Sequence, residues 1–262
     1  MNMFGLGKGK GKKLTAVSVT VSETGLVRRD NQDTAFVDAA QTVFCVADGM
    51  GGGAEGATAS RIVCEELAKT TSATSLVARM EAVNAAIRAA NGRILAYAKE
   101  RSFAQMGSTV VVLLFDPADS RRGAVCHIGD SRIYRVRRGR AEPLTKDHTV
   151  GEQLSEFASG EQAVGLKRRT NPLAHVLTRV VGAGENAFGD WRKLDLAEGD
   201  AFLVCSDGVH DVIADSRIGE ILSAGTELPA AANRLRDEIV GAGAPDNFSF
   251  VMVRLGVEND GR

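Results

Sequence analysis

Two apolar runs in this sequence stop at an aspartate that is followed by glycine. Residues 44–49 read FCVADG and residues 202–208 read FLVCSDG. Such runs, bounded by a turn dipeptide, predict strands that leave the core at the Asp-Gly step. One ending of this kind is an ordinary turn. Two of them raise the question of why buried strands of one chain should end in carboxylates.

Other aspartates stand in similar places beside apolar runs. The full set is Asp33 in RRDNQDTAF, Asp48 and Asp207 in the runs above, Asp130 in HIGDSR, and Asp246 in APDNFSF. If the strands share a core, their ends can meet, and clustered carboxylates repel one another unless cations neutralise them. Oxygen ligands without convergent His or Cys suit Mg²⁺ or Mn²⁺. From the residues alone, a two-metal carboxylate site and a set of plain turns both stay open.

The strand and helix signals come in blocks rather than in strict alternation. Strands are predicted over residues 15–21, 34–38, 42–47, 108–115, 123–130, 131–139, 201–208 and 247–255. Helices are predicted after the Gly-rich loop near residue 51 and over 75–101, 215–224 and 229–242, with short helices and a mobile loop over 146–175. This order predicts a layered α+β domain with antiparallel sheets. We expect one domain over residues 15–257, preceded by a tail.

Composition excludes several functional classes. The net charge is −1, with 44% hydrophobic and 25% charged residues, which favours neither nucleic acid nor a membrane surface as a partner. The basic, Gly-rich residues 1–14 predict a flexible tail, with a docking arm for anionic partners as the alternative, and they do not resemble a signal peptide. The cysteines form no CxxC pair and predict buried reduced thiols, hence a cytoplasmic protein: Cys45, Cys64, Cys126 and Cys205.

Eight motifs follow one another in an order that resembles a known family. They are RRDNQD, VADGMGG, MGSTVVVLL, HIGDSRIYRVRRG, LTKDHT, VLTRVVGA, FLVCSDGVHDVI and APDNFSFVMV. From about residue 15 to residue 255 the chain resembles the metal-dependent protein phosphatases (PPM, or type 2C), bacterial branch. The resemblance implies a four-layer α-β-β-α sandwich of two antiparallel sheets flanked by helices. It also implies two Mn²⁺ or Mg²⁺ ions, with a third, weaker one, in a cleft at one end.

The resemblance also implies roles for residues of the cleft. Asp48 would bridge the two ions, and the Gly49 carbonyl would bind one of them. Asp207 and Asp246 would bind the second ion, and Asp130 would bind the third. Asp33 would support metal-bound water, and Arg28 would bind the phosphate. A hydroxide that bridges the ions would attack phosphorus in line. The planar fork of Arg28 can hold two phosphate oxygens.

The implied activity is a serine/threonine phosphoprotein phosphatase. It would hydrolyse phosphoserine and phosphothreonine, reverse a bacterial Ser/Thr kinase, act on phosphorylated proteins and work as a monomer. One alternative is a pseudophosphatase that binds phosphoproteins without turnover. Another is a partner-switching phosphatase that acts on an anti-sigma antagonist.

Two residues depart from the family pattern. Gln32 stands where the family usually has Glu, so one negative charge is lost and one metal is expected to bind more weakly. Met50 stands where some relatives have a His proposed as general acid, although bacterial relatives often have Met.

The remaining candidates are histidines and a basic run. His127 is expected in the core or at its edge, and His175 in a structural role. His148 and His210 are expected near the cleft, where either could support the site. The basic run Lys167-Arg168-Arg169 falls in the family's variable flap, where it is either solvated or in contact with substrate.

Overall fold

The outermost strand of the first sheet is β1, which begins at Leu14 and lies antiparallel to the last strand of the chain. The computed structural model describes residues 12–51, 53–103, 105–167 and 171–257, with the backbone alone at Lys167. The first sheet has five strands, in the order β1 (Leu14–Glu23), β11 (Phe248–Val257), β10 (Ala201–Cys205), β7 (Arg132–Arg137) and β8 (Arg140–Pro143). Residues 1–11 of the predicted tail lie outside the described residues.

The second sheet is also antiparallel. Its strands run in the order β2 (Asp33–Val37), β3 (Val43–Met50), β5 (Val110–Phe115), β6 (Arg122–Ile128) and β9 (Asp190–Asp195), and the two-residue β4 (Gly107–Ser108) pairs with the end of β3. Some neighbouring strands are joined by hairpins, such as β2 and β3, whereas β1 and β11 come from opposite ends of the chain.

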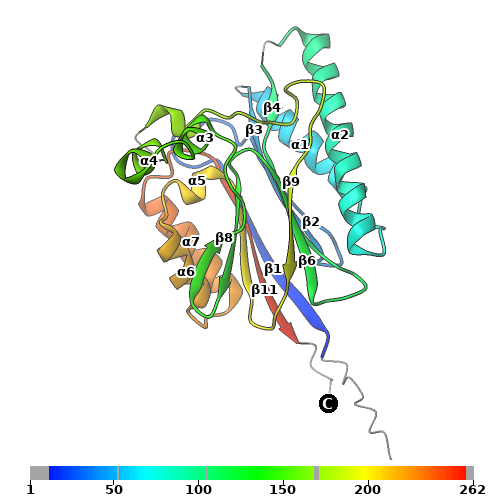
Figure 1. The fold of residues 1–262 in the computed structure, drawn as a ribbon, viewed down its shortest axis with the longest axis vertical. Coiled ribbons are helices and arrows are strands. Elements are labelled where there is room, and N and C mark those ends of the chain that lie inside the picture. The colour runs from blue at the N-terminus through cyan, green and yellow to red at the C-terminus, as the bar shows by residue number, and fades with distance from the viewer. Residues whose placement is uncertain (1–11, 52, 104, 168–170, 258–262) are drawn as a thin grey trace, which may run out of the picture.

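Two pairs of helices cover the outer faces of the sandwich (Figure 1). On the second sheet lie α1 (Ala54–Ala68) and α2 (Leu76–Arg101), and on the first lie α6 (Asp215–Ser223) and α7 (Leu228–Gly241). Shorter helices gather near one end of the sandwich: α3 (Val150–Ser155), α4 (Gly160–Lys167), the 3₁₀ turn η1 (Pro172–His175) and α5 (Asp207–His210).

Three hydrophobic cores separate these four layers. Alternation along β3 explains them, because Cys45 and Ala47 face the helices while Phe44 and Val46 face the opposite sheet. The sheets are joined by an aromatic chain in which Phe115 lies 5.2 Å from Phe44 and 5.9 Å from Phe202, between ring centroids. The predicted four-layer sandwich is therefore confirmed.

Two edge strands were not predicted. Strand β9 has a single buried residue, Leu194, so it lacks the apolar alternation that marks a strand. Strand β8 is short and ends in proline, and it forms a hairpin with β7 whose turn residues Arg138 and Gly139 both have positive φ. This is the two-residue turn that tightly linked strands favour.

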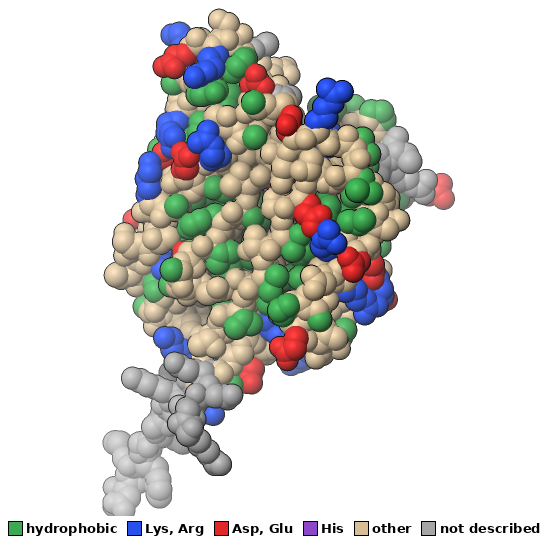
Figure 2. Space-filling model, turned by 180° about the vertical axis from the view of Figure 1, so that it is seen from behind, with side chains coloured by type: hydrophobic (Ala, Val, Ile, Leu, Met, Phe, Trp, Pro, Cys, Tyr) green, Lys and Arg blue, Asp and Glu red, His purple; other side chains and the backbone are tan. Residues whose placement is uncertain are grey.

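The surface is mixed in charge on the face seen in Figure 2, where acidic, basic and hydrophobic side chains are interspersed. In the described part of the chain, no helix is both long and apolar enough to cross a membrane. All four cysteines are buried and free of disulfides, as predicted, and the sulfur atoms of Cys45 and Cys64 lie 4.0 Å apart.

Candidate metal centre

The predicted aspartates lie at one end of the sandwich because of the antiparallel order of the strands. Asp33 opens β2 and pairs in register with Asp48 near the end of β3. Asp130 occupies the turn between β6 and β7, and Asp207 is the first residue of α5, two residues after β10 ends. Asp246 precedes β11 by two residues. Because neighbouring strands are antiparallel, one strand ends where the next begins. The residues that flank these strand ends therefore lie together at one end of the sandwich.

The carboxyl groups of Asp33, Asp48 and Asp207 lie close together, because the charges of Asp33 and Asp207 both raise the pKa of Asp48. The Asp48 and Asp207 side chains are joined by a hydrogen bond. The hydroxyl of Ser206 donates to Asp33 Oδ2 at 2.7 Å. One oxygen of Asp33 and one of Asp207 are buried without any hydrogen-bond partner among the described residues. Buried polar atoms without partners are rare and point to a ligand.

The electrostatics of the cluster agree with that geometry. Burial, together with the charge of Asp207, raises the pKa of Asp33 to about 7, against the opposing hydrogen bond from Ser206. Burial and then the charges of Asp211 and Asp246 raise the pKa of Asp207 to about 6. The pKa values of Asp48 and Asp130 are also raised well above the usual range, first by burial and then by neighbouring carboxylates. Ionised carboxylates in this arrangement require compensating positive charge.

The residues therefore fit divalent cations. The donors that converge here are carboxylate oxygens, two of them without partners, and hard ions such as Mn²⁺ and Mg²⁺ bind such oxygens. The charges of Asp33, Asp207 and Asp130 all raise the pKa of Asp48, so its carboxyl group lies near all three.

The Gly49 carbonyl has an organised environment of its own. A Cβ atom on Gly49 would lie 1.9 Å from the carbonyl oxygen of Gly56, so only glycine allows this close approach of two backbone segments. With its nitrogen facing Gly49, the Gln32 amide donates to the Gly49 carbonyl at 2.8 Å and accepts from the Gly53 N–H at 2.8 Å. The opposite amide orientation would set oxygen against oxygen, so the network assigns this one.

Gln32 also holds this region through its backbone. Its N–H donates to Asn247 Oδ1 at 3.0 Å, and its carbonyl accepts from the Gly49 N–H at 3.1 Å and from the Ser60 hydroxyl at 2.6 Å. An amide can donate to the Gly49 carbonyl, whereas the glutamate usual in the family could not when ionised. The departure noted in the sequence thus replaces a negative charge with a contact to the backbone.

Arg28 lies at the rim of the cluster and is bound to one of its carboxylates. Its Nη2 donates to Asp246 Oδ2 at 2.6 Å, and the side chain is 55% exposed. That hydrogen bond is the main cause that raises the pKa of Arg28, with further contributions from the charges of Asp207 and Asp48. The arginine is therefore near the cluster, as predicted, and its closest partner is a predicted metal ligand.

Asn247 is a residue of this site that the sequence analysis did not single out. Its Nδ2 donates to the carbonyls of Thr24 and Asp30 at 2.8 and 2.9 Å, so it fastens both ends of the loop that carries Arg28. The signal was present in the APDNFSF motif, where a buried asparagine follows the aspartate directly.

Asp211 is a second such residue. It lines a small polar pocket with Asp130, His175 and His210, and its charge raises the pKa values of both Asp130 and Asp207. The imidazole of His210 contacts the Asp130 carbonyl at 3.0 Å through Nε2, which confirms its place near the cleft. His175, expected in a structural role, lies in the same pocket and 3.6 Å from an Asp211 oxygen.

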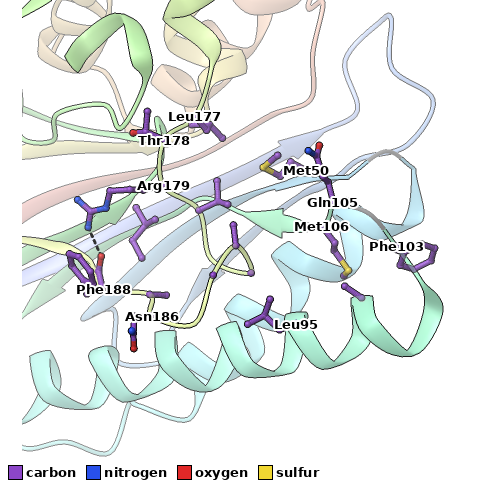
Figure 3. Close-up of a pocket in the computed structure, with 17 residues that line it drawn as sticks. Met50, Leu95, Phe103, Gln105, Met106, Leu177, Thr178, Arg179, Asn186 and Phe188 are labelled. Atoms are coloured by element: carbon purple, nitrogen blue, oxygen red, sulfur yellow. Dashed lines mark hydrogen bonds between the residues drawn. The ribbon is translucent and has the colours of Figure 1, made fainter. Parts of the chain in front are cut away.

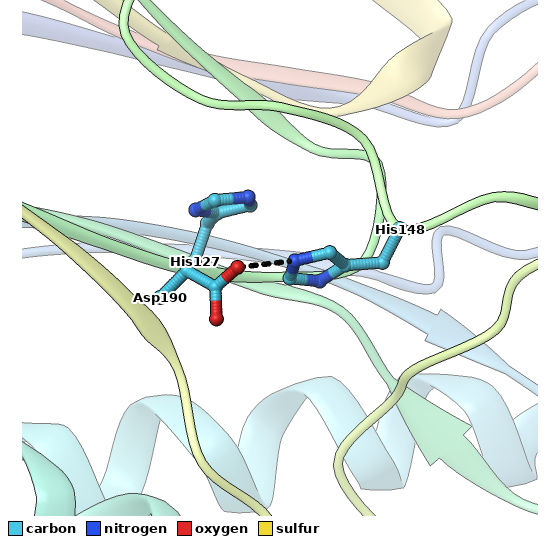
Figure 4. A group of neighbouring side chains, drawn as sticks. All are labelled: His127, His148 and Asp190. Atoms are coloured by element: carbon cyan, nitrogen blue, oxygen red, sulfur yellow. Dashed lines mark hydrogen bonds and ion pairs between the residues drawn. The ribbon is translucent and has the colours of Figure 1, made fainter. Parts of the chain in front are cut away.

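His127 and His148 form a stacked pair beside this region (Figure 4). Their ring centroids are 4.5 Å apart, and His148 Nε2 lies 3.1 Å from Asp190 Oδ2. His127 is buried, as predicted, and its Nε2 lies 2.6 Å from the Lys146 carbonyl. His148 Nδ1 accepts from the Gly129 N–H at 3.1 Å and so supports the turn that holds Asp130. Burial is the main cause that lowers the pKa of His148 to about 4.

The basic run of the predicted flap is described only in part. Arg168 and Arg169 lie outside the described residues, as does the side chain of Lys167. The segment around them forms α3, α4 and η1, in agreement with the short helices predicted there.

Comparison with known proteins identifies the class. The profile of the family described as protein phosphatase 2C matches residues 21–240. The serine/threonine protein phosphatase PstP of Mycobacterium tuberculosis is 33% identical over 232 residues, covering 88% of this chain and 43% of PstP.

Solved structures agree with that assignment. PppA, a key regulatory component of T6SS in Pseudomonas aeruginosa, superposes with a TM-score of 0.81 at 32% identity, covering 92% of this chain and 98% of PppA. The catalytic domain of PstP in complex with two manganese ions gives a TM-score of 0.78 at 32% identity, covering 93% of this chain and 99% of that domain.

The fold and the family match together define a metal-dependent protein phosphatase domain. The chain belongs to the protein phosphatase 2C family, in its bacterial serine/threonine phosphatase branch. It spans 43% of the length of the curated PstP proteins it matches.

Proposed function

We propose that this chain hydrolyses phosphoserine and phosphothreonine in proteins with the help of two Mn²⁺ or Mg²⁺ ions. The observation that carries the proposal is the convergence of Asp48, Asp207, Asp33 and Asp246 at one end of the sandwich, with two buried carboxylate oxygens that have no partner in the described chain. Membership in the family and the two manganese ions of the PstP catalytic domain support it.

The roles that the family resemblance implies carry over to this proposal. Asp48 would bridge the two ions, the Gly49 carbonyl would complete the first, and Asp207 and Asp246 would hold the second. Asp130 would bind a third ion in the polar pocket that it shares with Asp211. When bound, the ions supply a water of lowered pKa and neutralise the charge of the phosphate.

Asp33 and Arg28 complete the centre. Asp33 is held by the Ser206 hydroxyl and has a second oxygen without a partner in the described chain, which can orient a water molecule at the cleft. Arg28 uses Nη2 to bind Asp246 and has further N–H donors that can take a phosphate oxygen. Met50 cannot donate a proton, so a water molecule at the centre would protonate the leaving oxygen of serine or threonine.

The wider setting of this activity is also part of the proposal. The substrates would be phosphorylated proteins, the phosphatase would reverse a Ser/Thr kinase, and one domain over residues 15–257 would act as a monomer in the cytoplasm. The relatives named as serine/threonine phosphatases support the substrate class.

A phosphate-release assay tests the proposal. The full chain is incubated with a phosphothreonine peptide in Mn²⁺ or in EDTA, alongside Asp48→Asn and a matched control, Asp237→Asn. Asp237 is exposed on α7, and its carboxylate pairs with Arg236, which is not a member of the cluster. We expect Mn²⁺-dependent turnover by the wild type and the control, and a loss of about a thousandfold in Asp48→Asn. Peptide binding without turnover by the wild type would identify a pseudophosphatase instead.

A further inference from the structure

A cavity of about 650 Å³ opens beside the end of β3 (Figure 3). Its walls come from α2, from the segment after α2 and from the loop over residues 177–188. The side chains that give it an apolar character are Met50, Leu95, Ala98, Phe103, Met106 and Phe188. Nothing in the proposed reaction uses this cavity.

The cavity borders the candidate metal centre through a single strand. Met50, which lines it, follows Asp48 by two residues in β3. Two residues of a strand span about 7 Å, and an extended peptide advances by the same amount in two residues. If the phosphate of a bound peptide lies at Asp48, a peptide side chain that enters the cavity therefore belongs to a residue within about two positions of the phosphorylated one.

The walls are held in place by hydrogen bonds to the loop. Asn91 of α2 accepts from the Gly182 N–H at 2.7 Å and donates to the Gly184 carbonyl at 3.0 Å. Ser108 and Val181 exchange two backbone hydrogen bonds, at 2.9 and 2.8 Å. Gly182 has φ +101°, and a Cβ there would lie 2.4 Å from Ile94, so the loop lies directly against the helix. A cavity fixed in this way is preformed, as binding sites usually are.

Arg179, the charged residue at the mouth of the cavity, already has partners within the chain. Arg179 donates to Asp190 Oδ1 at 2.8 Å and to the Phe188 carbonyl, and its guanidinium lies 4.8 Å from the centroid of the Phe188 ring. Its charge is thus directed to Asp190, at the rim. The interior offers methionine, leucine and phenylalanine surface to a ligand.

We propose that this cavity binds an apolar side chain of the phosphoprotein, of leucine or phenylalanine size, within two positions of the phosphorylated residue. The inference rests on the proposed phosphatase function. It makes the cavity a determinant of substrate choice, because an apolar residue there gains burial that alanine or aspartate does not.

Peptide discrimination tests this inference. Phosphothreonine peptides that carry Leu, Ala or Asp at one position from −2 to +2 are compared by kcat/KM in Mn²⁺. At one of these positions we expect Leu to exceed Ala by about tenfold and Asp by more. Equal kcat/KM values at all four positions would overturn the inference, while turnover itself would leave the phosphatase function standing. No turnover of any peptide or of p-nitrophenyl phosphate would overturn both.

Variants of α2 test whether the preference for a leucine peptide arises in the cavity. Ala98→Trp places a large side chain in the cavity, so the Leu-to-Ala ratio should fall close to one. Ala96→Trp is the matched control, because Ala96 is exposed on the same helix and does not line the cavity, and it should keep the ratio.

Leu95→Lys provides a second test if Ala98→Trp fails to fold. It places a positive charge at the cavity wall, so the preference at the same peptide position should move from Leu toward Asp. Folded Ala98→Trp and Leu95→Lys proteins that both keep the wild-type preference would show that the apolar side chain binds elsewhere.

Discussion

Replacing Asp207 with asparagine should stabilise the metal-free protein. Burial and the charges of Asp211 and Asp246 raise the pKa of Asp207 from 3.8 to about 6 in the folded chain. Between those pH values the folded state binds more protons than the unfolded state, so the stability of the wild type falls as pH rises through this window. Above it, the ionised Asp207 costs about 3 kcal/mol of folding free energy.

An asparagine at this position has nearly the same shape and no charge. In EDTA at pH 8, Asp207→Asn should therefore be more stable than the wild type by up to about 3 kcal/mol. For a chain of this size that corresponds to a rise in Tm of roughly 6–12 °C. The difference should shrink toward pH 4, where Asp207 is protonated in the folded wild type and is becoming protonated in the unfolded chain.

Melting curves in EDTA across this pH range measure the effect, with Asp237→Asn as the exposed control. In millimolar Mn²⁺ the order should reverse, because metal that binds only the folded state adds about 2.7 kcal/mol at a hundredfold excess over Kd, and the variant has lost a ligand. If Asp207→Asn melts no higher than the wild type at pH 8 in EDTA and responds equally to Mn²⁺, Asp207 lies in an ordinary turn.

Three further changes test the surroundings of the cluster. Arg28→Ala should raise KM for a phosphopeptide roughly tenfold and lower kcat less, because the arginine binds the ground state and the transition state alike. Steady-state kinetics with an unaltered KM would place Arg28 away from the phosphate. Gln32→Glu loses the donor to the Gly49 carbonyl, so the free energy of unfolding of the metal-free protein should fall by about 1–2 kcal/mol, while the added charge should increase the rise in Tm with Mn²⁺. An unchanged Tm in EDTA would contradict the hydrogen bond. Asn247→Ala should release the loop that carries Arg28 and cost about 2–3 kcal/mol, with faster amide exchange over residues 24–32; unchanged exchange would show that the loop is held by other contacts.

Much of this site could be predicted from the sequence because its residues lie at strand ends. The apolar runs before Asp48 and Asp207 are rich in β-branched and aromatic residues, so both strands were predicted. The turns expected at the two Asp-Gly steps were wrong, because β3 continues through Asp48 and Gly49 to Met50 and Asp207 begins the short helix α5. The pairing of Asp33 with Asp48 follows from the hairpin that joins their strands. Their assembly with Asp207 depends on how the two sheets pack. Local sequence patterns do not contain that packing, and it was predicted from the family resemblance.

Other features depend on tertiary contacts that leave little trace in the sequence. Strand β9 reads DWRKLD and shows no alternation, because it is an exposed edge strand held by its pairing with β6. The bond between Arg28 and Asp246 joins residues 218 positions apart. The direction of the Gln32 amide is set by the Gly49 carbonyl and the Gly53 N–H around it, which only the folded chain brings together.

We propose that the aspartates at this end of the sandwich hold a pair of divalent cations. The most direct measurement is the anomalous scattering of manganese in crystals of the full chain grown with Mn²⁺. We expect two strong peaks that share Asp48 as a ligand, one also at the Gly49 carbonyl and the other at Asp207 and Asp246. A single peak, or peaks confined to His127, His148 and Asp190, would contradict it.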